Sequence, residues 1–142
     1  MAGMWLVLTD PYSHDDALKR AGLEARYSGK LINIVFLIDP DTLKELVCDL
    51  GEKGWLGPES RRILQTSLLD GYRALATDVL DEMQHKFTLE GIVVETQVKE
   101  SPLESYIHSL LNSGAVKVIV SGSKSLTPHL PTSDVRVEWF VN

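Results

Sequence analysis

The chain has 142 residues, of which 44% are hydrophobic and 24% charged, and its formal net charge is −6 at pH 7. The length predicts one domain over residues 1–142, and the acidic balance argues against nucleic acid or an anionic membrane as a partner, because phosphates would be repelled. The only cysteine, Cys48, permits no intrachain disulfide and fits a reducing compartment. The apolar run at residues 4–8 meets Asp10 too soon to be a signal peptide or membrane span, so we expect a cytoplasmic protein.

The first elements in the chain are two apolar strands around one helix. Residues 4–9 predict a buried strand. Ser13 and Asp16 resemble a capping box, and we expect them to begin a helix with a face of small residues that Gly29 ends. Residues 31–38 form an almost unbroken apolar run, which is typical of a strand covered on both faces in a parallel sheet.

The middle of the chain predicts two helices joined by a glycine-rich loop. The first helix is predicted from the helical spacing of four apolar residues, Leu43, Leu46, Val47 and Leu50. Residues 51–58 hold three glycines and Trp55, and we interpret them as a mobile flap, or else as a loop whose tryptophan packs on a helix. A long helix is expected from Pro58 to Phe87. Its expected apolar stripe consists of Leu64, Leu68, Tyr72, Leu75, Val79, Met83 and Phe87.

The last part of the chain predicts three strands and one helix. The strands are expected over residues 92–98, 116–120 and 135–141. Ser101 begins the helix as its cap, with Pro at the first position and Glu at the third, and Gly114 ends it. Strands that alternate with helices indicate a parallel sheet with helices on both faces. Ligands of such sheets bind beyond the carboxyl ends of the strands.

No motif in the chain predicts catalysis or a bound metal. The histidines lack metal-ligand spacing, and His108, four residues after Glu104, is explained by a helix-surface pair. Ser121 and Lys124 match an S-x-x-K pattern, but the prolines that follow at 128 and 131 disfavour the helix that this chemistry needs. A hydrolase acting on phosphorylated metabolites would need a nucleophile–base pair or a metal cluster, and the sequence offers neither.

Four segments together resemble the universal stress protein family, and the likeness covers nearly the whole chain. They are residues 6–10, 34–39, 98–102 and 118–124. The resemblance implies a Rossmann-like α/β fold: a five-stranded parallel sheet of order 3-2-1-4-5 with helices on both faces. It also implies a ligand cleft between the first and fourth strands. The candidate ligand-binding residues are Asp10, Leu37, Asp39, Ser121, Gly122, Ser123, Lys124 and Ser125.

The glycine pattern that holds phosphates in nucleotide-binding members of that family, G-x2-G-x9-G-[ST], is degenerate in this chain. With Gly122 as the first glycine, Ser125 and Val135 replace the next two, and Arg136 replaces the hydroxyl residue. The final helix of the family is expected to be missing or vestigial. We therefore expect no ATP and no cofactor. The alternative is an adenine-nucleotide sensor that uses a modified Ser/Lys anion loop at residues 121–125.

The predicted fifth strand is an apolar edge strand, which would promote aggregation if it were left open. Dimers of the resembling family often pair this strand antiparallel, which would set Arg136 against Glu138 of a second copy. The candidate dimer interface consists of Arg136, Val137, Glu138, Trp139 and Phe140. The sequence thus predicts a non-catalytic regulatory domain of the stress-protein type, homodimeric, that acts through protein contacts or an unidentified small ligand.

Overall fold

Five parallel strands form one sheet at the centre of the structure, a computed structural model that describes residues 3–9, 15–29, 31–41, 43–44, 47, 57–122 and 136–141. The strands are β1 (Met4–Leu8), β2 (Ile32–Ile38), β3 (Val94–Glu100), β4 (Lys117–Gly122) and β5 (Val137–Val141). Their order is β3-β2-β1-β4-β5, which confirms the order expected from the sequence. The strand order runs outward in opposite directions from β1 and β4, so the carboxyl ends of these two strands flank the topological switch point.

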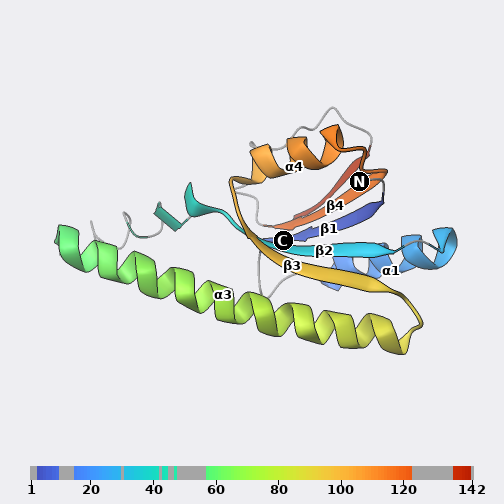
Figure 1. The fold of residues 1–142 in the computed structure, drawn as a ribbon, viewed down its shortest axis with the longest axis horizontal. Helices are drawn as coiled ribbons and strands as arrows, with labels where there is room; N and C mark the ends of the chain where they lie inside the picture. The colour runs from blue at the N-terminus through green and yellow to red at the C-terminus, as the bar shows by residue number, and fades with distance from the viewer. Residues whose placement is uncertain are drawn as a thin grey trace.

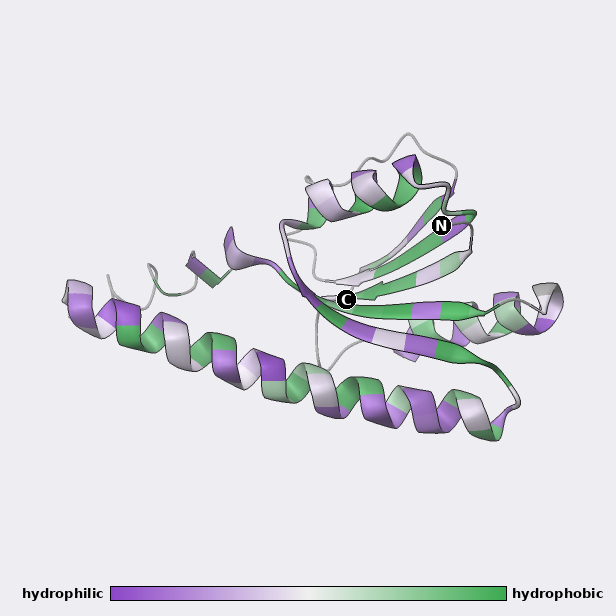
Figure 2. Ribbon diagram, in the orientation of Figure 1, coloured by the Kyte–Doolittle hydropathy of each residue, from purple (hydrophilic) through white to green (hydrophobic). Residues whose placement is uncertain are grey.

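Helices cover both faces of the sheet (Figure 1). α4 (Leu103–Asn112) lies over one face, and α1 (Asp15–Ser28) and α3 (Pro58–Leu89) lie over the other. The layers follow from the strands, since β1 and β2 are buried along their whole length and therefore need cover on both sides. Figure 2 shows the same contrast: β2 is apolar except at one residue, Asn33, whereas the edge strand β3 carries several polar residues.

The face of α1 that meets the sheet is made of small side chains, as the sequence predicts. Ala17, Ala21 and Ala25 are almost completely buried, so the helix axis lies close to the strands. Gly29 ends the helix with φ of 66°, a left-handed conformation that glycine adopts without a steric penalty.

α3 is much longer than the strands that it covers. Its 32 residues span about 48 Å at 1.5 Å per residue, whereas a seven-residue strand spans about 23 Å. Only its C-terminal half packs fully on the sheet, and the other half extends past it (Figure 1). The buried residues are Ala76, Leu80, Met83 and Phe87. Met83 and Phe87 of the expected stripe are buried, and Leu68, Tyr72 and Val79 are partly buried and pack against the same core. Ala76 and Leu80, which were not in the expected stripe, are also buried, whereas Leu75 is only partly buried.

Several sequence predictions lie outside the described residues. These are the cap at Ser13, Leu46 and Leu50 of the helix after β2, Cys48, and Trp55 in the glycine-rich loop. In the same helix, Leu43 and Val47 are helical and buried, as expected. The predicted lack of a final helix also concerns residues 123–135, which are not described.

Candidate functional site

Asp39 follows the last residue of β2 and holds the start of α4. Its Oδ2 accepts a hydrogen bond at 3.1 Å from the backbone N–H of Leu103, the first residue of α4. Its Oδ1 accepts another, at 2.9 Å, from the N–H of Asp41. Ser101, the expected cap, instead donates its hydroxyl to the Pro102 carbonyl. The sequence assignment of the cap is therefore wrong, because an acidic side chain from another strand takes that position.

Thr9 bridges the carboxyl ends of β1 and β4. Its backbone N–H and its hydroxyl both donate to the carbonyl oxygen of Ser121, at 3.1 and 2.8 Å. Ser121 itself is 1% exposed, and Gly122 is buried beside it. These bonds extend the pairing of β1 and β4 by one residue, at the place where the family resemblance puts a cleft.

The topology brings the described candidate residues to one edge of the sheet. Leu37, Asp39, Ser121 and Gly122 all lie at or just beyond the carboxyl ends of β2 and β4. Leu37 is 1% exposed and belongs to the hydrophobic core under α4. The remaining candidates lie outside the described residues: Asp10, Ser123, Lys124 and Ser125.

The side chains of β5 alternate between the two faces of the sheet. Val137 and Trp139 pack against the core under α4, whereas Phe140 packs against the core under α1 and α3. The guanidinium of Arg136 donates to the carbonyls of Leu111 and Ala115, at 3.3 and 3.4 Å. Both aromatic side chains of the predicted interface therefore contribute to the core of their own chain.

Glu138 is the centre of an ion-pair cluster that ties β5 to its neighbours. Arg20 of α1 donates Nε and Nη2 to its two carboxylate oxygens, at 2.8 and 3.0 Å, and Lys117 of β4 approaches Oε1 to 2.7 Å. Arg20 also pairs with Glu24 one turn further along α1. The hydrogen bond from Arg20, and after it the bond from Lys117, lower the pKa of Glu138, although partial burial acts in the opposite direction.

The described residues were compared with the side-chain groups that bind metal ions. No group of three or more His, Cys, Asp or Glu side chains in the described ranges is placed to hold one. His108 pairs loosely with Glu104 at 3.8 Å, and both side chains are more than half exposed, which fits the expected helix-surface pair. None of the helices described here has the length and apolar character needed to cross a membrane.

The solved structures that this chain resembles include universal stress proteins. A protein of the universal stress protein family from Burkholderia pseudomallei superposes with a TM-score of 0.67 at 18% identity, over 99% of this chain and 96% of that chain. The universal stress protein UspA from Lactobacillus plantarum gives a TM-score of 0.66 at 15% identity, over 97% of each chain. No family model and no curated protein matches the sequence. The chain therefore has the universal stress protein fold.

Three residues whose side chains connect β1, β4, β5 and α1 were not among the sequence candidates. Thr9 bonds a residue 112 positions away, and Arg20 bonds one 118 positions away. Lys117 begins β4 and lies beside β5. No local signal identifies such partners, because a threonine after a strand or an arginine on a helix is ordinary until the sheet order is known.

Proposed function

We propose that this chain is a non-catalytic regulatory domain of the universal stress protein type that does not bind ATP. It acts as a homodimer, through contacts with another protein or through a small ligand. The observation that supports this proposal most directly is that polar atoms at the carboxyl edge of the sheet already form hydrogen bonds with other residues of the chain. Both oxygens of Asp39 and the carbonyl of Ser121 are occupied by hydrogen bonds within the chain.

The sequence supports the same proposal, because it lacks the residues that would bind the phosphates of ATP. A phosphate cradle needs small residues, so that successive backbone N–H groups approach the anion. Ser125 and Val135 stand where two of the glycines belong, and the prolines at 128 and 131 supply no N–H donors. An adenine-nucleotide sensor built on the Ser/Lys loop at residues 121–125 is the second candidate.

Calorimetric titration with ATP and AMP is expected to give no binding tighter than about 1 mM, the affinity of a weak, non-specific contact. Mass spectrometry of the purified protein under native conditions is the companion measurement, since a tightly held nucleotide would be retained. A micromolar dissociation constant for ATP that the Asp10→Ala substitution abolishes would support the sensor instead and would contradict the proposal.

The backbone of β5 supports a dimer better than its side chains do. The N–H of Val118 donates to the carbonyl of Arg136 at 2.8 Å, in the register that pairs Val118 with Val137. Because peptide groups alternate in direction along a strand, those of Val137 and Trp139 point away from β4. A second copy of β5 can pair with these outward groups. The Arg136–Glu138 pair across the dimer is not needed, because Glu138 is held by Arg20.

Sedimentation velocity at micromolar concentration is expected to give a dimer for the parent protein and a monomer for Val137→Pro. Proline removes an N–H that faces the open edge, so the pairing with β4 is kept while the pairing with a second copy is lost. Val137→Thr keeps that N–H and serves as the matched control, for which a dimer is expected. A monomeric parent protein, or a dimer that tolerates Val137→Pro, would refute the proposed interface.

A further inference from the structure

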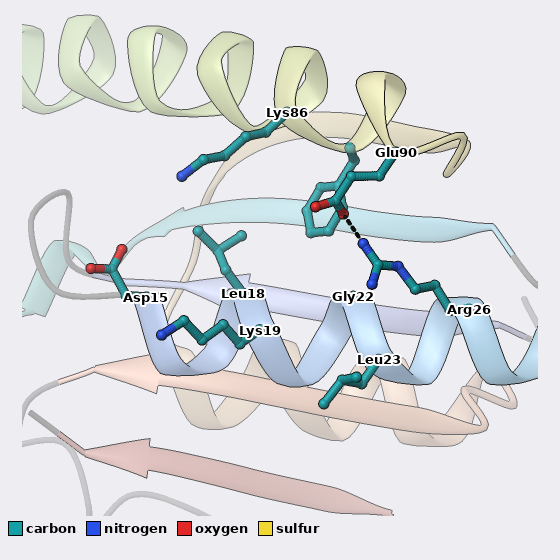
Figure 3. A pocket seen from close by; sticks show the side chains of 9 residues that line it. Asp15, Leu18, Lys19, Gly22, Leu23, Arg26, Lys86 and Glu90 are labelled. Carbon is teal, nitrogen blue, oxygen red and sulfur yellow. Dashed lines mark ion pairs between the residues drawn. The ribbon is translucent and has the colours of Figure 1, made fainter.

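A groove of about 610 Å³ lies between α1 and the C-terminal turns of α3 (Figure 3). Its apolar wall consists of Leu18, Leu23 and Phe87. Gly22 lies opposite the ring of Phe87, and a Cβ atom at position 22 would lie 3.4 Å from that ring, so the two helices are close together at this point. Leu23 remains 60% exposed at the rim. This volume falls within the range of about 300–1,000 Å³ that is typical of small-molecule sites.

The polar groups of the groove are divided between its two ends. At one end Arg26 and Glu90 form an ion pair at 3.0 Å across the gap between the helices. At the other end Lys19 and Lys86 extend from opposite walls towards the Asp15 end, as Figure 3 shows. Neither lysine forms an ion pair or hydrogen bond with any residue in the described part of the chain.

The lysine end of the groove has a positive balance in a chain whose net charge is −6. Among the described residues that line this end, the ammonium groups of Lys19 and Lys86 outnumber the carboxylate of Asp15, and the ion pair at the other end is neutral. A ligand that matches this arrangement has one anionic head for Lys19 and Lys86 and an apolar body for the leucine and phenylalanine wall. Such a ligand needs no contact with the carboxyl edge of the sheet.

From this juxtaposition of an exposed apolar wall with two lysines that have no partner among the described residues, we propose that the groove binds a small amphiphilic carboxylate, such as a free medium-chain fatty acid. The head lies between Lys19 and Lys86, and the chain lies along Leu18, Leu23 and Phe87. The site is separate from the cleft of nucleotide-binding relatives, so the outcome of the ATP titrations does not affect it.

The test uses sodium decanoate, below its micelle concentration, as the probe and nuclear magnetic resonance of the full chain as the readout. Amide shifts that cluster at residues 15–26 and 86–90 are the expected result. Decanol, which has the same chain without the charge, and inorganic phosphate, which has the charge without the chain, are each expected to bind at least fivefold more weakly. Shifts that cluster elsewhere, or decanol binding as tightly as decanoate, would overturn the proposal.

Variants test the two halves of the site separately. Lys19→Gln and Lys86→Gln are each expected to weaken decanoate binding about two- to fivefold, the size of an exposed charge interaction, while Lys99→Gln on β3 leaves it unchanged. Leu23→Ser is expected to weaken binding, whereas Tyr27→Ser, 96% exposed on the same helix and outside the groove, is not. If both lysine variants bind like the parent protein, the assignment is wrong.

A variant that is expected to bind decanoate more tightly separates an effect on ligand binding from an effect on the structure. Asp15→Asn removes the carboxylate that opposes the anionic head, and about twofold tighter binding is expected. General destabilisation of the helix pair would instead weaken binding in every variant. Weaker binding in Asp15→Asn, with an unchanged circular dichroism spectrum, would therefore count against the proposed position of the head.

Discussion

Glu138→Gln is expected to lower the free energy of unfolding by about 2 kcal/mol at pH 7. The value lies between the ~0.2–1 kcal/mol of an exposed ion pair and the ~3–5 kcal/mol lost when one partner of a fully buried pair is removed. The Glu138 side chain is 30% exposed and is held by Arg20 and Lys117. Neutral glutamine removes the counter-charge of Lys117 and leaves Arg20 with Glu24 alone, so β5 is held less tightly. Urea unfolding monitored by circular dichroism measures the difference.

The exposed pair between Glu104 and His108 provides the matched control. Glu104→Gln removes the same charge from a pair at 3.8 Å that is more than half exposed, and a change below about 0.5 kcal/mol is expected. A double-mutant cycle with Arg20→Met then isolates the pairwise term, because each single variant removes the same contact. Equal effects of Glu138→Gln and Glu104→Gln would show that the cluster does not hold β5.

The contribution of Glu138 also predicts the pH dependence of stability. Its folded-state pKa is lowered, chiefly by the hydrogen bond from Arg20. The stabilisation is therefore complete above the unfolded-state pKa of about 4.3 and is lost as the pH falls through the lower folded-state value. Repeating the urea titrations at pH 7 and about pH 3 is expected to narrow the gap between the parent protein and Glu138→Gln. A gap that widens in acid would contradict this sign.

Asp39→Ala is expected to cost about 2 kcal/mol, because it removes the cap of α4 and the turn bond to Asp41 together. Loss of an N-terminal cap costs about 0.5–2 kcal/mol, and an ordinary hydrogen bond contributes about 1 kcal/mol. Asp39→Asn keeps one carbonyl acceptor and is expected to lose about half as much. Urea unfolding measures the loss of stability. Hydrogen exchange at the Leu103 amide, which donates one of the two hydrogen bonds to Asp39, reports the local effect on α4.

Asp41→Ala is the matched control for Asp39, since it removes an exposed neighbouring carboxylate that caps nothing among the described contacts. A change below about 0.5 kcal/mol is expected. The two roles considered for Asp39 give different outcomes. A capping residue loses stability and exchange protection at Leu103 when it is replaced, whereas a ligand residue would leave both unchanged and affect binding alone.

The sequence by itself determines the architecture of this protein. Solid apolar runs at residues 4–9 and 31–38 predict strands covered on both faces, and helices between strands predict a parallel sheet. Gly29 and the small face of α1 predict a helix packed close to that sheet, and the structure confirms both. These features are local, because hydrophobic periodicity and glycine conformation depend on neighbours within a few residues.

Only the tertiary structure decides which polar groups meet. The cap of α4 comes from Asp39, 64 residues before it, and the partner of Glu138 is Arg20, 118 residues away. The groove beside Gly22 exists because α1 and α3 approach each other on the same face of the sheet. Such contacts depend on strand order and helix placement, and charged or hydroxyl side chains carry no periodic signal that specifies a distant partner. The sequence therefore determines the fold, whereas the pairing of its polar residues is fixed only when the strands and helices have come together.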